Sequence, residues 1–349
     1  MIGTITFHWA VNYGAVLQAY ALQRSLAEKG YDAEIIDYVP SRVRIREMLS
    51  HLKKGDKEYF VKKKKMAPFV KNELKLSAKK YGTNAKLMKC SDMYDAVICG
   101  SDQVWNEFFT QHAEGKPTLS YFLNFVGKNT KKIGYAVSFG TEKLTDAMKK
   151  LIAPEVKTFK AISVREKTGT DILSDLGVQS EQVCDPTLLF DGKYYEDLVK
   201  KAKNVEKQRV FSYIIHANQS EAVKISDTVK DHFGESHTGK YYYPMCGIYE
   251  WLAGIYNSEF VVTNSFHGTV FAILFHKPFI ITTIKGSGMN DRIYTLLSSA
   301  GLMDRMVSEC DEKAIEKLIS EKTDWDEVDK KLGLIRNKSA QFLEEALNS

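Results

Sequence analysis

The sequence predicts an α/β protein with two Rossmann-like parallel-sheet domains that face a cleft. Its 349 residues exceed what one hydrophobic core usually serves, which favours two domains. Short apolar runs that end in glycine or polar residues recur in both halves of the chain, as expected of buried parallel strands. Near the start, a helical stretch separates two such runs, and this strand–helix–strand order is typical of a parallel sheet.

The first half begins with a strand–helix–strand unit. Between its two strands, the segment AVLQAYALQRSLAEKG predicts a helix, because alanine and leucine residues recur on one face and Gly30 occupies the place of a C-terminal cap. After a basic segment the strand pattern resumes. Strands are predicted at Ile2–Phe7, Ala33–Tyr38, Tyr94–Gly100, Ile133–Gly140 and Ala161–Glu166.

The second half repeats this pattern of short strands and helices after Asp185-Pro186. Strands are predicted at Arg209–Ile215, Phe260–Ser265 and Phe279–Thr282, and helices near Gln219–His232 and at Gly268–His276. We therefore predict an N-terminal domain (1–165), a C-terminal domain (166–308) and a helical C-terminal segment (309–349). The carboxyl ends of the strands would line the cleft, where open α/β sheets normally bind ligands.

The positive charge of the chain is concentrated in one segment. Residues 41–90 contain 16 Lys and Arg against 4 Asp and Glu, a balance of +12, so the remainder carries −7 (5 − 12). We predict that the segment 41–93 is a mostly helical insertion, densest in charge at VKKKKMAPFVK. It either faces a polyanion, such as a membrane surface, a lipid-linked phosphate or nucleic acid, or is a solvated surface.

Composition narrows the class of protein further. The five cysteines stand singly, without a CxxC pair, which favours reduced thiols in a cytosol over disulfides or a zinc site. No run reaches the roughly 20 apolar residues of a membrane span, and MIGTITFHWA lacks the features of a signal peptide. P-loop, HExxH, GxSxG and clustered metal-ligand motifs do not occur in the sequence.

The segment TNSFHGT, between a strand and a helix, is the first candidate site. Ser265 can cap the helix, and Gly268 allows a close approach to the backbone. A helix N-terminus attracts anions, so His267 could bind a phosphate or carboxylate, or act as a general acid. A purely structural histidine is the alternative, and for His276 it is the favoured one.

Other polar residues follow predicted strands. Arg165 could pair with a carboxylate or phosphate, or form a salt bridge with Glu166. Asp102, beside Gln103, could order or deprotonate a sugar hydroxyl, or cap the next helix. Near the start, Asn12 and Gly14 would lie at a helix N-terminus, in a segment that is not GxGxxG.

A further loop, GSGMNDRIYTLL, supplies three polar side chains that could face the cleft. They are Ser287, Asn290 and Arg292. Arg292 could be a second contact to an anion, with a surface salt bridge as the alternative.

Taken together, these segments resemble the polysaccharide pyruvyl transferase family. The resemblance rests on NYGAVLQAYAL, YDAVICGSDQVWN, YAVSFG, ISVREKTGTDIL, VCDPTLLF, FVVTNSFHGTVFAILFHKPFI and NDRIYTLLSSAGL, which occur in this order over most of residues 5–305. It implies a fold like that of GT-B glycosyltransferases. It also implies transfer of pyruvate from phosphoenolpyruvate to a sugar, as a cyclic ketal, during surface polysaccharide biosynthesis.

The resemblance also suggests roles for individual residues. The donor-binding histidine of the family corresponds to His267; some relatives have an Arg-Leu-His run where this chain has Ser265-Phe266-His267. A family arginine near a strand end corresponds to Arg165. The expected site comprises catalytic His267 and Asp102, donor-binding Arg165, Ser265, Gly268, Thr269 and Arg292, and acceptor-binding Asn12, Gly14, Gln103, Ser138 and Asn290.

No cofactor or metal is expected beside phosphoenolpyruvate as co-substrate. The acceptor would be a sugar linked to a lipid or a nucleotide, nucleic acid would not be a partner, and the protein would be cytoplasmic, with membrane contact through 41–93 as one interpretation.

Two alternative functions stay open. One is a GT-B-type glycosyltransferase that uses a nucleotide sugar, because fold does not settle function. The other is a non-catalytic binding protein of polysaccharide assembly.

Overall fold

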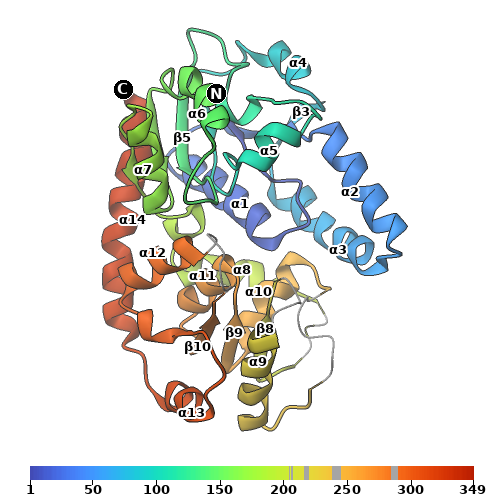
Figure 1. Cartoon of the computed structure of the whole chain (residues 1–349), viewed down its shortest axis with the longest axis vertical. Coiled ribbons are helices and arrows are strands. Elements are labelled where there is room, and N and C mark those ends of the chain that lie inside the picture. Colours follow the sequence, from blue (N-terminus) through green and yellow to red (C-terminus); the bar gives the residue numbers. More distant parts are fainter. Residues whose placement is uncertain (204, 206, 216–219, 238–244, 284–289) are drawn as a thin grey trace. The chain divides into compact units, whose positions relative to one another are not determined.

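The computed structural model describes residues 1–203, 205, 207–215, 220–237, 245–283 and 290–349 (Figure 1). The chain divides into two compact units. Unit 1 consists of Met1–Lys63, Val70–Leu189 and Ile335–Ser349, and unit 2 of Lys64–Phe69 and Phe190–Leu334. Each unit contains its own parallel sheet, which confirms the predicted α/β fold class.

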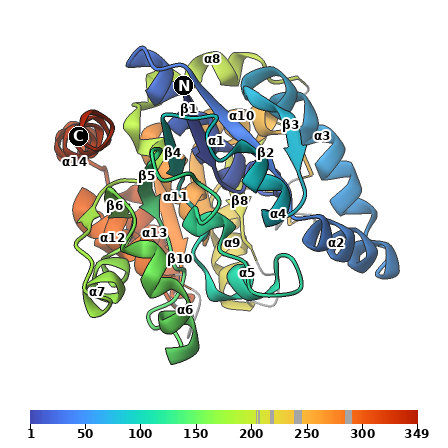
Figure 2. The same ribbon diagram turned by 90° about the horizontal axis from the view of Figure 1, so that it is seen from above.

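The described residues of unit 1 form a seven-stranded parallel sheet with the order β3-β2-β1-β4-β5-β6-β7 (Figure 2). Its strands are β1 (Ile2–Ile5), β2 (Ala33–Tyr38), β3 (Leu76–Tyr81), β4 (Ala96–Cys99), β5 (Lys131–Val137), β6 (Ala161–Val164) and β7 (Glu181–Gln182). The direction of progression reverses between β1 and β4, as in Rossmann folds, and this reversal marks the usual ligand position.

Helices cover both faces of this sheet because its central strands are apolar on both sides. The helices from this part of the chain are α1 (Tyr13–Glu28), α2 (Ser41–Lys53), which has no buried residue, α3 (Lys57–Glu73), α4 (Asn84–Leu87), α5 (Glu107–His112), α6 (Asp146–Val156) and α7 (Lys167–Asp175), with 3-10 turns at Met88–Cys90, Ser120–Phe122 and Pro186–Leu189. Trp105 anchors one core: it stacks on Phe122 at 4.8 Å between centroids, and its Nε1 donates to the Tyr121 carbonyl at 2.9 Å.

The basic segment 41–93 is not a purely helical insertion. It contains α2, α3 and α4, but also β3, which pairs with β2 at the edge of the sheet. Lys79 and Lys80 of β3 are exposed, and lysines are common on edge strands because they discourage further pairing. Unit 1 also continues past residue 165, the boundary expected from the sequence, because β7 pairs with β6.

The described residues of unit 2 form a four-stranded parallel sheet with the order β11-β10-β9-β8. The strands are β8 (Val210–Tyr213), β9 (Phe260–Thr263), β10 (Phe279–Thr282) and β11 (Met306–Val307). The helices are α8 (Gly192–Lys200), α9 (Ser220–His232), α10 (Ile248–Asn257), α11 (Phe266–Leu274), α12 (Asn290–Ala300) and α13 (Glu312–Ser320), with a 3-10 turn at Met303–Arg305. Helices α9 and α13 bury one face of the sheet, while Trp251 of α10 packs against Phe211 and Tyr213 on the other.

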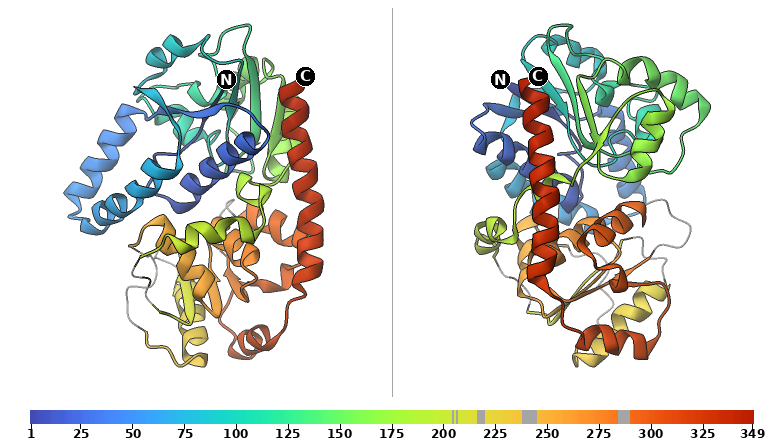
Figure 3. Two further views of the ribbon diagram at one scale, coloured as in Figure 1. Left: turned by 180° about the vertical axis from the view of Figure 1, so that it is seen from behind. Right: turned by 90° about the vertical axis from the view of Figure 1, so that its left-hand side faces the viewer.

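The final helix, α14 (Trp325–Asn348), is continuous (Figure 3). Its last 14 residues return to unit 1, where Phe342 packs on Tyr135 of β5 and Leu343 is fully buried. The Ser339 hydroxyl accepts the N–H of Cys184 at 2.9 Å, and Arg336 Nε donates to the Leu188 carbonyl at 2.9 Å. The C-terminal segment is therefore part of the core of unit 1.

Candidate functional site

Unit 1 gathers polar residues at the carboxyl ends of four adjacent strands. Ser101 and Asp102 follow β4, Ser138 follows β5, Arg165 follows β6, and Asp185 comes shortly after β7. Because all four strands are parallel and adjacent, their ends share one edge of the sheet. The structure therefore brings together three of the predicted site residues, Asp102, Ser138 and Arg165, and adds Asp185.

Arg165 lies at the centre of this cluster and is buried. Its Nη1 donates to Asp185 Oδ2 at 2.6 Å, its Nη2 lies 3.6 Å from Asp102 Oδ1, and its Nε lies 3.9 Å from Glu166 Oε2. Burial alone would lower the pKa of the Arg165 guanidinium, but attraction by Asp185, Asp102 and Glu166 raises it. The salt bridge to Glu166, the alternative to anion binding by Arg165, is thus present, but the shortest contact is with Asp185.

Asp102 has an unusual backbone conformation. Its φ of +75° lies in the left-handed region, which few residues other than glycine adopt without cost. Its carbonyl accepts the N–H of Ser138 at 3.1 Å, and its Oδ1 accepts the N–H of Gln103 at 2.9 Å. It does not cap the following helix, because Asn106 caps α5 by accepting from Phe108 N at 3.0 Å. These bonds fix the carboxylate at the strand end.

The predicted acceptor residues near the chain start lie beside the reversal point of the sheet. Asn12 caps α1 and accepts from Ala15 N at 3.2 Å, which confirms that it and Gly14 lie at a helix N-terminus. Helix α1 follows β1, and Gln103 follows β4, the strand next to β1. The Thr6 hydroxyl joins the two strand ends by donating to the Ser101 carbonyl at 2.9 Å.

Unit 2 contains the second cluster, at the turn from β9 to α11. Ser265 is the N-cap, as predicted, and its hydroxyl accepts the N–H of Gly268 at 3.3 Å. The Thr269 hydroxyl donates back to the Ser265 carbonyl at 3.0 Å. A Cβ at Gly268 would lie 2.5 Å from Thr263 Oγ1, so this glycine is required for helix α11 to pack on β9.

His267 is the second residue of α11 and is buried at this turn. Its ring meets that of Phe266 edge-on, with 5.1 Å between centroids, and Arg292 of α12 places its Cζ 5.8 Å from the same Phe266 ring. The structure thus gathers His267, Ser265, Gly268, Thr269 and Arg292 in one part of unit 2. Asn290 is the first residue of α12, whereas Ser287 lies outside the described residues.

Several polar residues in these clusters were not predicted. Asp185 accepts the Thr187 hydroxyl and amide and the Ser101 hydroxyl, as well as Arg165. In the sequence, the feature that could have indicated Asp185 is its place before a proline and directly after a short apolar run. Asn264 holds the end of β8 by two bonds to Ile215, of 2.7 and 2.8 Å.

A histidine near the chain start was also missed. His8 Nε2 lies 3.2 Å from Asp37 Oδ1 at the ends of β1 and β2. Its position just after the first strand, in HWAVNYG, was the only signal in the sequence.

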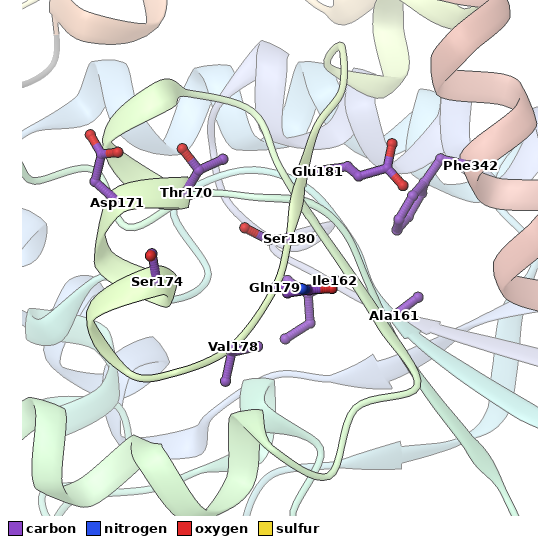
Figure 4. A pocket seen from close by; sticks show the side chains of 10 residues that line it. All are labelled: Ala161, Ile162, Thr170, Asp171, Ser174, Val178, Gln179, Ser180, Glu181 and Phe342. Atoms are coloured by element: carbon purple, nitrogen blue, oxygen red, sulfur yellow. The ribbon is translucent and has the colours of Figure 1, made fainter.

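A separate hollow of about 560 Å³ lies in unit 1 between α7, β6, β7 and α14 (Figure 4). Its lining includes Ala161 and Glu181, the first residues of β6 and β7, and Phe342 of α14. It therefore opens at the amino ends of these strands, opposite the edge that carries Asp102 and Arg165. Among the described residues, no group of three or more His, Cys, Asp or Glu side chains is placed to hold a metal ion.

Comparison with known families identifies the chain. The sequence model of the polysaccharide pyruvyl transferase family matches residues 12–285, well over half of its length. The chain belongs to the polysaccharide pyruvyl transferase family. The match spans both clusters, from Asn12 to His267, and confirms the resemblance drawn from the motifs. Comparison with curated proteins gave no match.

Solved structures show a similar fold at low sequence identity. The UDP-N-acetylglucosamine 2-epimerase from Rickettsia bellii aligns with a TM-score of 0.55 and 8% identity over 99% of this chain and 96% of that one. The UDP-GlcNAc 2-epimerase from Neisseria meningitidis, bound to UDP-GlcNAc, aligns with a TM-score of 0.55 and 9% identity over 99% of this chain and 98% of that one. The UDP-GlcNAc 2-epimerase from Methanocaldococcus jannaschii aligns with a TM-score of 0.54 and 10% identity over 92% of both chains. These likenesses support the GT-B-like fold.

Proposed function

We propose that this protein transfers the pyruvyl group of phosphoenolpyruvate to two hydroxyl groups of a sugar, forming a cyclic ketal during polysaccharide biosynthesis. The observation that carries the proposal is the family match over residues 12–285. Family members of this kind need a site for a small, highly charged donor and another for a sugar. The two polar clusters offer candidates for both.

We assign donor binding to the β9–α11 turn of unit 2. Phosphoenolpyruvate carries a phosphate and a carboxylate, which require hydrogen-bond donors and positive charge. The turn offers the first-turn backbone of α11, the side chain of His267 and, at the ring of Phe266, the guanidinium of Arg292. Arg292 thus brings an arginine to the ring of Phe266, the residue after Ser265, near the position at which some relatives carry an arginine in sequence.

We assign the sugar to the strand ends of unit 1. Asp102 is the candidate base, with Gln103, Ser138, Asn12 and Gly14 as acceptor contacts. Arg165 is already engaged by Asp185, and lies within 4 Å of Asp102 and Glu166. It therefore fits a role in positioning Asp102 better than a role as a direct ligand of the donor.

The proposed reaction balances with these groups. A proton delivered to the methylene carbon of phosphoenolpyruvate gives a methyl group and leaves positive charge on the adjacent carbon. One sugar hydroxyl adds to that carbon, and the second displaces phosphate. The two hydroxyls lose two protons: one replaces the proton delivered to the methylene, and the other leaves with phosphate. His267 could deliver the proton or hold the phosphate, and Asp102 would accept a hydroxyl proton.

The first test is thermal unfolding with and without phosphoenolpyruvate. A ligand at one hundred times its dissociation constant stabilises a protein by about 2.7 kcal/mol, a readily measured shift. We expect this shift in the wild type and in His232→Ala, whose histidine is exposed on α9, and its loss in His267→Ala. Release of inorganic phosphate on addition of sugar acceptors would then report turnover.

Three outcomes would contradict the proposal. If a nucleotide sugar stabilised the wild type and phosphoenolpyruvate did not, glycosyl transfer would become the better interpretation. If His267→Ala kept the full shift while remaining folded, the donor would bind elsewhere. Full binding of donor and acceptor without phosphate release would favour the non-catalytic alternative.

A further inference from the structure

Helix α2 presents its apolar side to solvent. None of its residues is buried, and the side chains of Ile45, Met48, Leu49 and Leu52 are 53, 40, 46 and 56% exposed. Their spacing of i, i+3, i+4 and i+7 places them in one stripe that covers about 100° of the helix surface. Such a stripe normally faces the protein core, and here it does not.

The opposite side of α2 faces the rest of unit 1 instead. Val43, Glu47, Ser50 and His51 are the partly buried residues of this helix, and three of these four are polar. His51 also pairs with Asp56 at 2.8 Å. The helix is thus held by its more polar side, so packing within unit 1 does not account for the exposed stripe.

Cations flank the stripe. At 3.6 residues per turn, Arg42, Arg46 and Lys53 lie along one edge and Arg44 lies toward the other. A groove of about 430 Å³ beside α2 combines basic and apolar side chains. Its lining includes Arg44, Lys80, Lys86, Val39, Ile45 and Met48. Figures 1 and 2 both show α2 at the periphery of unit 1.

We propose that α2 docks unit 1 onto the surface of an anionic lipid bilayer, with the stripe entering the headgroup region and the flanking cations contacting lipid phosphates. Cations alone would suit any polyanion, including nucleic acid, but the four adjacent apolar side chains require an apolar phase beside the negative charge. Docking of this kind is peripheral. Among the described helices, none is long and apolar enough to cross a membrane.

This proposal assigns the bilayer contact to a different part of the basic segment than its charge density indicates. The run Lys62–Lys65 has the densest charge in the sequence, but its members are largely occupied. Lys62 is buried with its Nζ 3.9 Å from the centre of the Tyr13 ring, and Lys65 donates to the Met245 carbonyl at 2.8 Å. The exposed surface of α2, and not this run, has the properties of a bilayer contact.

Co-sedimentation with vesicles tests the proposal. We expect the wild type to bind vesicles of phosphatidylcholine with phosphatidylglycerol, not those of phosphatidylcholine alone, and to bind less as salt rises. The Leu49→Glu/Leu52→Glu variant should lose at least about tenfold in affinity. The Arg42→Gln/Arg46→Gln/Lys53→Gln variant should lose on the order of a hundredfold at low salt.

Matched variants elsewhere control for hydrophobicity and charge. Leu334 is 69% exposed on α14, so Leu334→Glu should bind vesicles as the wild type does. Lys193→Gln/Lys313→Gln/Lys322→Gln removes three exposed charges outside the segment and should keep most of the binding. As a direct probe, the tryptophan fluorescence of a Leu52→Trp variant should shift to shorter wavelength when anionic vesicles are added. The fluorescence of a Leu334→Trp variant should not shift.

Three results would overturn the proposal. The first is equal binding of the wild type to neutral and anionic vesicles, or no binding to either. The second is unchanged binding by the Leu49→Glu/Leu52→Glu variant. The third is a lipid-free dimer that this variant converts to a monomer in sedimentation velocity, which would show that a second copy covers the stripe.

Discussion

The placement of Arg165 shows how one residue can organise a strand-end cluster. A buried guanidinium close to three carboxylates replaces the hydration that all four groups lose on folding. Removing the cation would leave Asp185, Asp102 and Glu166 with their hydrogen bonds but without the positive charge that they share. The network therefore couples the stability of unit 1 to the orientation of the candidate base Asp102.

Arg165→Met should consequently destabilise the protein by about 3–5 kcal/mol in urea unfolding, because it leaves buried charges unpaired. Arg209 provides the matched control: it pairs with Glu259 at 2.7 and 2.8 Å, but both side chains are about half exposed. Arg209→Met should therefore cost less than about 1 kcal/mol. Similar losses in the two variants would show that the Arg165 network contributes no more than a surface ion pair.

Gly268 and Asp102 show which properties of a single residue the sequence does not reveal. Gly268 suggested close approach of a ligand, but the structure gives a steric reason within the fold, namely contact with Thr263. Asp102 is identified by its place after a strand, whereas its positive φ accompanies a bridge to Val137 of the neighbouring strand, which the sequence does not reveal. Sequence locates such residues, but partners distant in the chain determine their conformation.

At the scale of elements, strands with uniform apolar composition were predictable and mixed ones were not. β4 and β9 were predictable because burial on both faces demands nearly continuous apolar runs. β3, with sequence LSAKKY, was taken as part of a helical segment because only one of its edges pairs and its lysines face water. Charge composition likewise pointed to Lys62–Lys65, because it does not reveal which cations a tertiary contact occupies.

Helix α9 contains a residue whose titration should affect stability. Burial lowers the pKa of Lys230 to about 8, and attraction by Glu235 and Asp227 offsets only part of this effect. Between about pH 8 and 10.5 the unfolded chain holds this proton and the folded chain does not, so stability gains as pH rises through this window. Below about pH 8 Lys230 is protonated in both the folded and the unfolded chain, so the folded protein bears the full cost of burying the charge.

The wild type should therefore gain about 1–3 kcal/mol in free energy of unfolding, relative to Lys230→Met, between about pH 8 and 10.5. Urea unfolding of both proteins across this range measures the difference and cancels the titration of groups that they share. Parallel stability curves would mean that the folded protein keeps Lys230 protonated, for example by turning its amine to solvent.

At the scale of the whole molecule, sequence order and structural units do not coincide. Unit 1 is assembled from the first 63 residues, a middle segment that ends at Leu189 and the last 15 residues of the chain. Composition predicted a helical C-terminal segment, which α13 and α14 confirm. It could not predict that residues 335–349 complete unit 1, because an amphipathic stripe does not specify which sheet it covers.

Deletion of residues 335–349 should accordingly unfold unit 1 and not unit 2. It removes the buried side chains of Phe342, Leu343 and Leu347, each contributing about 1.5–3 kcal/mol, and the partner of the Cys184 amide. The sum approaches the stability of a typical domain. Hydrogen exchange should therefore show lost protection in β5 and β6 with protection retained in β9 and β10, as α14 up to Leu334 stays with unit 2.

A chain that ends after Leu347 is the control, since it lacks only Asn348 and Ser349 and keeps every buried side chain of α14. It should exchange like the full-length protein. If the longer deletion preserved protection in β5, the last turns of α14 would be an accessory layer, and unit 1 would be complete at Leu189. If both units lost protection together, unit 2 would depend on a folded unit 1, and the chain would have to be treated as one cooperative unit in every stability measurement proposed above.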